Sequence, residues 1–265
     1  MYGTDDTTGS DAGAMRRRDL RKDWAAGRAT LGCMLMIPSG FSAELVASAG
    51  FDFVVVDWQH GLFGYEGMLS MVQAIGNRAT PIVRVSWNDP SLIMRALDAG
   101  ADGVIVPMVN SPAEAKAAAQ ACRYAPVGHR SWGPTRSALG VPSFGPQHDN
   151  DRVICAVMIE TVTAVEQVEE ILAVPGVDMA FVGPADLSLS RSGGLEAPGQ
   201  TPADRALIEK VMAAAERNAV VLGTAVTGAE AARSFLERGF RFIAVHNDAG
   251  LLATTAREIL LATRQ

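Results

Sequence analysis

The sequence predicts an α/β fold, a closed (β/α)₈ TIM barrel, and three observations support this prediction. Short apolar runs recur eight times along the 265 residues, helical patterns lie between them, and several helical stretches end in Gly. Strands that alternate with helices form parallel sheets, and eight such units fit the usual length of a barrel. A doubly wound open sheet is the structural alternative, but "IPSGFSAE" is a poor version of its phosphate-binding turn.

The eight apolar runs are the expected barrel strands. The clearest is "FVVVD", in which the first four residues are apolar without alternation, as in a strand that is buried on both faces. The runs cover residues 31–37, 53–57, 81–85, 103–107, 155–160, 179–184, 220–225 and 242–246.

Helical spacing is clearest in three segments rich in Ala, Leu, Glu and Arg, at residues 112–123, 164–173 and 251–264. Gly50, Gly100 and Gly239 each lie between a helical stretch and the next strand. Gly is favoured there because the chain must take a left-handed conformation to leave the helix.

Composition indicates a globular protein, with 48% hydrophobic residues and a net charge of −6. This charge disfavours nucleic acid as a partner, and the basic run at residues 16–22 is interpreted as the solvated first turn of a helix. The three cysteines form no C-x-x-C pair, which fits a reducing cytoplasm. We find no membrane span or signal peptide and expect a cytoplasmic protein.

Residues 1–14 are small and polar, and we expect a disordered tail there. The remaining residues, 15–265, are expected to form a single barrel domain.

Charged side chains end several of the predicted strands. Active sites of this fold lie at the carboxyl ends of the strands, where buried charge is otherwise expensive. The residues concerned are Asp57, His60, Arg84, Glu160 and Asp186. Purely structural functions stay open for each residue. Asp57 would cap a loop, Arg84 would form an ion pair, His60 would pack in a loop, and Glu160 and Asp186 would cap helices.

Glu160 and Asp186 are 26 residues apart, about one βα unit. They should lie on neighbouring strands with their carboxylates side by side, where they repel each other unless a proton or cation lies between them. A hard divalent cation such as Mg²⁺ or Mn²⁺ suits two carboxylates and water.

Four segments resemble the HpcH/HpaI family of metal-dependent pyruvate-type aldolases: "FDFVVVDWQHG", "VRVSWNDP", "MIET" and "VDMAFVGPADLSLS". The resemblance covers the chain from about residue 18 onward. It implies a class II aldolase on a barrel, a Mg²⁺, Mn²⁺ or Co²⁺ cofactor, and a homohexamer of three dimers that exchange their last helix.

The resemblance also implies a function for individual residues. Glu160 and Asp186 would hold the metal, His60 would be the general base, and Arg84 would stabilise the enolate oxygen. Asp98 matches the acid that orients this His in some members, and Asp57 matches another polar residue of the site. The substrate would be bound by Gln59, Met158, Gly183, Pro184 and Ala185.

This chain departs from the family pattern at three positions. Many members have Glu in place of Gln59, and the best-known bacterial members have Gln in place of Met158 and Trp in place of Met34. These positions lie near the substrate, so the sequence does not predict the aldehyde.

The predicted reaction is the reversible cleavage of a 4-hydroxy-2-oxo acid to an aldehyde and pyruvate, or a related acid such as hydroxypyruvate. A Schiff-base route is disfavoured because Lys22, Lys116 and Lys210, the only lysines, all lie in predicted helices. Two alternatives remain: a citrate-lyase-like lyase that acts on a CoA thioester, and a barrel that binds a ligand without turnover. No nucleic acid or membrane is expected as a partner.

Overall fold

A closed parallel barrel forms the centre of the computed structural model, in which residues 17–139, 141, 144–194 and 201–264 are described. The strands are β1 (Thr30–Leu35), β2 (Phe53–Asp57), β3 (Thr80–Arg84), β4 (Gly103–Val106), β5 (Ile154–Ile159), β6 (Met179–Val182), β7 (Val221–Ala225) and β8 (Phe242–Asn247). Each strand pairs in parallel with its neighbours in sequence, and β8 pairs with β1 to close the sheet. The (β/α)₈ prediction is therefore confirmed.

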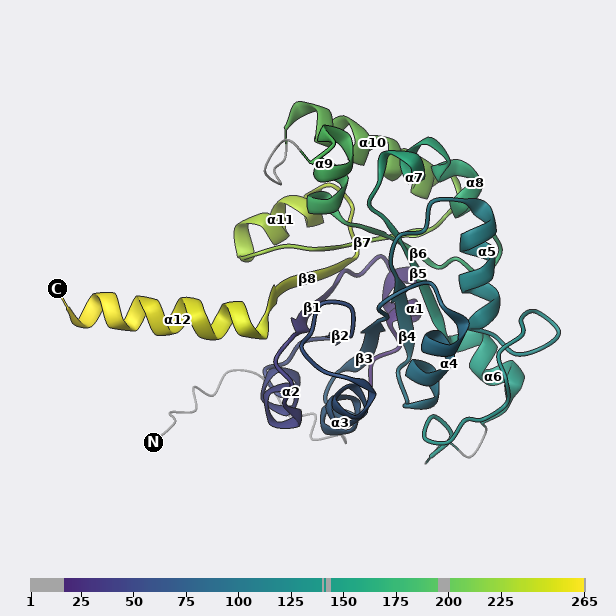
Figure 1. The fold of residues 1–265 in the computed structure, drawn as a ribbon, viewed down its shortest axis with the longest axis horizontal. Coiled ribbons are helices and arrows are strands. Elements are labelled where there is room, and N and C mark those ends of the chain that lie inside the picture. Colours follow the sequence, from purple (N-terminus) through teal and green to yellow (C-terminus); the bar gives the residue numbers. More distant parts are fainter. Residues whose placement is uncertain (1–16, 140, 142–143, 195–200, 265) are drawn as a thin grey trace.

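Helices surround the barrel (Figure 1). They are α1 (Leu20–Ala25), α2 (Gly40–Ala47), α3 (Tyr65–Ile75), α4 (Pro90–Asp98), α5 (Pro112–Ala121), α6 (Pro146–Arg152), α7 (Val162–Glu166), α8 (Val168–Leu172), α9 (Pro184–Ser192), α10 (Pro202–Arg217), α11 (Ala229–Glu237) and α12 (Asp248–Thr263). Among the described residues, no helix is long and apolar enough to cross a membrane.

Strand β2 shows why the apolar runs are unbroken. Phe53 and Val55 belong to the core inside the barrel, whereas Val54 and Val56 belong to the core between barrel and helices. Both faces of the strand are therefore buried, as predicted. The ring of Phe53 lies against Gly32 of β1, where an added Cβ would stand only 2.3 Å from the ring, so this strand accepts no side chain there.

Helix α1 closes the amino-terminal end of the barrel, and here the structure corrects an expectation. Arg17, Arg18 and Arg21 were expected to be solvated, but each forms an ion pair with an acid that immediately precedes a strand. The partners are Asp102 before β4, Asp52 before β2 and Asp178 before β6. The basic run therefore holds the first helix under the barrel, and Leu20 of this helix belongs to the interior core.

Two segments differ from the pattern in the sequence. The helical stretch at residues 164–173 is divided into α7 and α8 at Gln167, whose φ is −110° and ψ is 15°. The long segment at residues 128–150 contains most of a short helix, α6. Residues 1–14 lie outside the described residues, so the disordered tail and the boundary of the barrel domain stay predictions.

Helix α12 extends away from the barrel, at the left of Figure 1. Residues 251–264 are exposed along its whole length, including Leu252 and Ile259, which are 66% and 63% exposed. Its first residue, Asp248, is buried and accepts hydrogen bonds from the backbone N–H groups of Met36 and Ile37 and from the hydroxyl of Ser42. The loop after β1 therefore fixes the start of α12.

Candidate active site

Asp57 and Arg84 form a buried ion pair at the carboxyl end of the barrel. They are the last residues of β2 and β3, and the register of these strands places them opposite each other. The Nε and Nη2 atoms of Arg84 donate to the two carboxylate oxygens of Asp57, at 2.9 and 2.6 Å. The Asp57 side chain is fully buried and the Arg84 side chain is 12% exposed, so the pair is held rigidly at the rim.

His60 lies in the turn that follows β2. The Oδ1 atom of Asp57 accepts the backbone N–H groups of Gln59 and His60, each at 3.2 Å, so Asp57 also shapes this turn. The imidazole of His60 is exposed and makes no hydrogen bond with the described residues. The Oε1 atom of Gln59 is buried without a hydrogen-bond partner among the described residues, which leaves an acceptor beside the rim.

Glu160 and Asp186 follow the neighbouring strands β5 and β6. Ile159 pairs with Val182, so Glu160 and Gly183 leave the barrel at the same level. Glu160 is 2% exposed, and its Oε1 atom accepts the backbone N–H of Met108 at 2.7 Å. Asp186 lies in the first turn of α9 and is exposed.

The surroundings of Glu160 suit a divalent cation. Burial raises the pKa of its carboxyl, and the charge of nearby Asp186 raises it further, whereas the Met108 hydrogen bond and Arg84 lower it. A cation held by the two carboxylates would offset both the cost of burying the Glu160 charge and its repulsion with Asp186. Among the described residues no third His, Cys, Asp or Glu joins the pair. The donor set therefore fits a cation that keeps positions open for substrate and water.

Predicted substrate-binding residues line the same rim. An added Cβ at Gly183 would stand 3.0 Å from the Oε2 atom of Glu160 and 3.3 Å from the Cε atom of Met158, so the backbone at Gly183 lies close to the Glu160 carboxylate. Met158 itself is buried in the interior core, directly below this backbone. Pro184 and Ala185 begin α9, where backbone N–H groups of the first helical turn are available to an anion.

Within one chain, Asp98 does not lie at this rim, so its predicted contact with His60 is not made there and stays a prediction. It ends α4, a helix that returns the chain to the amino-terminal end of β4, so it lies at the end of the barrel opposite His60. Within one chain, Asp98 instead accepts Nη2 of Arg130 at 2.7 Å. The buried Arg130 also pairs with Asp149, so it serves as a structural ion-pair partner.

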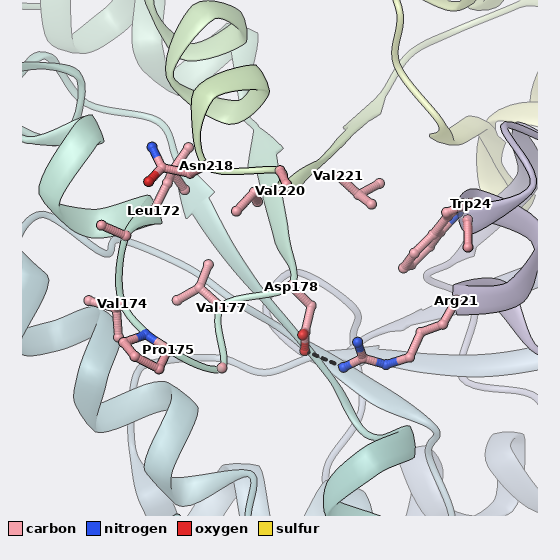
Figure 2. Close-up of a pocket in the computed structure, with 14 residues that line it drawn as sticks. Arg21, Trp24, Leu172, Val174, Pro175, Val177, Asp178, Asn218, Val220 and Val221 are labelled. Atoms are coloured by element: carbon pink, nitrogen blue, oxygen red, sulfur yellow. Dashed lines mark ion pairs between the residues drawn. The ribbon is translucent and has the colours of Figure 1, made fainter.

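A cavity of about 520 Å³ opens at the amino-terminal end of the barrel, away from the predicted site (Figure 2). Trp24, Val177 and Val220 contribute apolar walls, and the ion pair between Arg21 and Asp178 lies at its edge. None of the predicted site residues lines it.

Sequence reasoning missed the residue that holds Glu160. Met108 donates its backbone N–H to this carboxylate, and a backbone donor leaves no trace in residue type. The sequence also gives no sign of the left-handed φ of 56° at Met108, because such a conformation is predicted only where Gly or Asn occurs.

The chain is similar to known aldolases over most of its length. The chain is 38% identical over 239 residues to the 2-dehydro-3,6-dideoxy-6-sulfogluconate aldolase of Pseudomonas putida, covering 89% of this chain and 93% of the relative. It is 37% identical over 239 residues to the 4-hydroxy-2-oxo-heptane-1,7-dioate aldolase of Escherichia coli, covering 88% and 90%. These relatives support a carbon–carbon lyase that performs aldol cleavage.

A solved structure extends the similarity to the fold. The HpcH/HpaI aldolase/citrate lyase family protein of Burkholderia cenocepacia J2315 superposes with a TM-score of 0.84 at 32% identity, covering 90% of this chain and 96% of that one. Residues 34–255 match the family described as HpcH/HpaI aldolase/citrate lyase. The chain therefore belongs to the HpcH/HpaI aldolase/citrate lyase family.

Proposed function

We propose that this chain is a divalent-metal-dependent aldolase that cleaves a 4-hydroxy-2-oxo acid to an aldehyde and pyruvate or hydroxypyruvate. The proposal rests on two groups of side chains that lie at the same end of the barrel. The first is the carboxylate pair of Glu160 and Asp186, and the second is the Asp57–Arg84 ion pair beside His60. Glu160 and Asp186 would hold Mg²⁺, Mn²⁺ or Co²⁺. When bound, the cation supplies Lewis-acid stabilisation of negative charge on the 2-oxo group.

The protein's own residues would perform the proton transfers. His60 takes the proton of the substrate's 4-hydroxyl, directly or through water, because an imidazole exchanges protons near neutral pH. The C3–C4 bond then breaks, its electron pair forms the enolate, and the 4-carbon leaves as an aldehyde. Return of a proton to C3 completes the 2-oxo acid.

Arg84 supplies a fixed positive charge close to the enolate oxygen. Its guanidinium is held by Asp57 through two hydrogen bonds, so it requires little reorganisation when charge develops. The backbone of Gly183, Pro184 and Ala185 would bind the carboxylate of the substrate at the start of α9. The Oε1 atom of Gln59, which has no hydrogen-bond partner among the described residues, would accept a substrate hydroxyl.

We also propose that a second copy of this chain covers α12. Helix α12 exposes Leu252 and Ile259, and α2 beside its first turn exposes Phe41 and Leu45. Several large exposed apolar side chains on two neighbouring helices are typical of an interface. We expect a homohexamer built from three dimers, in which each last helix packs on its partner.

Release of pyruvate from a simple 4-hydroxy-2-oxo acid tests the proposed reaction. Chelation should abolish the release, and Mg²⁺, Mn²⁺ or Co²⁺ should restore it. Glu160→Gln should weaken Mn²⁺ binding strongly, whereas Glu170→Gln, an exposed acid on α8, should leave it unchanged. Full activity in excess chelator would contradict metal dependence. Activity on a CoA thioester without pyruvate release would favour a citrate-lyase-like reaction instead.

A further inference from the structure

The loop after β4 takes a backbone conformation that its residues do not favour. Met108, two residues after the strand, has φ = 56°, and only Met108 and Ala219 combine a side chain with a positive φ among the described residues. A side chain clashes with the backbone in this left-handed region. A residue other than Gly therefore keeps this conformation only where surrounding contacts impose it. Such conformations cluster at functional sites, and Met108 lies beside the proposed metal site.

The unusual backbone presents one N–H group to Glu160. The Met108 N–H donates to Oε1 of Glu160 at 2.7 Å, a short bond to a carboxylate that is 2% exposed. The Oε2 atom lies toward Gly183, where an added Cβ would stand 3.0 Å away. One oxygen is therefore fixed by the backbone, and the other faces the strand that leads to Asp186.

Asn110 locks this conformation from the other side. Its Nδ2 donates to the carbonyl of Met108 at 3.0 Å, and its Oδ1 accepts the hydroxyl of Thr161, the residue that follows Glu160. Gln167 donates to the backbone carbonyl of Asn110 at 3.0 Å. The loops after β4 and β5 are thus joined, and the Met108 N–H is aimed by contacts on both flanks.

We propose that Met108 and Asn110 are positioning residues, whose imposed backbone conformation presents Glu160 to a divalent cation in one orientation. The inference rests on the proposed function, because it assigns a cation to Glu160 and Asp186. It goes beyond that function in naming the loop after β4 as a determinant of metal affinity. Neither residue touches the reacting atoms in this scheme. They act through the carboxylate, as outer contacts of metal ligands commonly do.

Mn²⁺ binding to the full-length protein, followed by electron paramagnetic resonance, tests the inference independently of turnover. Met108→Val should raise the Kd of Mn²⁺ by about 10- to 100-fold, because a β-branched residue disfavours positive φ and the N–H turns away. Met108→Gly should bind nearly as tightly as wild type, since Gly adopts this φ without strain. Ala219→Val is the matched control: it introduces the same strain at φ = 53°, before β7 at the opposite end of the barrel, and should leave the Kd unchanged.

Asn110→Asp provides a second test should Met108→Val not fold. It retains the acceptor for Thr161 but places a carboxylate oxygen against the Met108 carbonyl, so the Kd should again rise. Wild-type affinity in both Met108→Val and Asn110→Asp would overturn the inference and leave the proposed function standing. A wild-type protein that binds no Mn²⁺ would overturn both together.

Discussion

Replacing Asp57 with Asn tests the buried ion pair that holds Arg84 at the rim. In the wild-type protein, Nη2 of Arg84 donates to Oδ2 of Asp57 at 2.6 Å. Asn retains one oxygen acceptor, but it places an amide NH₂ group opposite Nη2, where no acceptor remains. One charge-assisted hydrogen bond is lost and a guanidinium that is 12% exposed is left without its counter-charge. Removing one partner of a buried pair typically costs about 3–5 kcal/mol, and we expect the free energy of unfolding to fall by that amount.

A double-mutant cycle with Arg84→Met separates the pair from other effects of the substitutions. The double variant leaves no unpaired charge. Its free energy of unfolding should therefore fall by less than the sum of the falls in the two single variants, with a coupling energy of about 2–3 kcal/mol. Urea unfolding at one fixed protein concentration measures all four proteins, because association would otherwise alter apparent stability. The exposed pair Glu169–Arg217 provides the control cycle and should show no measurable coupling. Additivity within about 0.5 kcal/mol at Asp57 and Arg84 would refute the reasoning.

Three further predictions concern the base, the assembly and the buried acid. His60→Ala should lower kcat by about 10²- to 10⁴-fold with little change in KM, measured by pyruvate release. Deleting residues 249–265 should shift the protein to smaller species in light scattering, because the exposed apolar side chains of α12 would lose their partner surface. In the metal-free protein, burial raises the pKa of Glu160 above its ordinary value of 4.5. The folded state then binds more protons than the unfolded state, so stability falls as pH rises from 4.5 through the raised pKa.

Each of these predictions has a control. His129→Ala changes an exposed histidine of the long loop after α5 and should leave kcat unchanged. A monomeric mass for the intact chain would contradict the assembly. Glu160→Gln should make this fall in stability with pH shallower, measured by urea unfolding between pH 4.5 and 8, and an unchanged slope would count against the burial of its charge as a cause.

Much of the fold and of the site could be predicted from sequence because burial leaves a strong pattern. Strand β2 begins and ends at the predicted residues, since Phe53 to Val56 are buried on both faces. Glu160 was recognisable because a carboxylate directly after such a strand needs a chemical reason. Gly50, Gly100 and Gly239 have the predicted positive φ, of 95°, 97° and 97°.

The remaining features depend on contacts between distant segments. Gln167 divides a helical stretch while its side chain donates to the backbone of Asn110, which no local pattern encodes. The expected contact between Asp98 and His60 is absent within one chain, since α4 carries Asp98 to the other end of the barrel. Arg17, Arg18 and Arg21 looked solvated because the acids before β4, β2 and β6, with which they pair, are 34 or more residues away.

The carboxylate of Asp248 ties the start of α12 to the loop after β1. It starts α12, the helix proposed to pack on a neighbouring subunit, and it also binds the backbone of Met36 and Ile37 just after β1, at the end of the barrel that carries the proposed active site. A displacement of α12 would therefore pull on the loop after β1, at the same end of the barrel as the proposed active site. Dilution should consequently lower the turnover of each subunit as well as the mass of the particle, so that catalysis becomes a reporter of association.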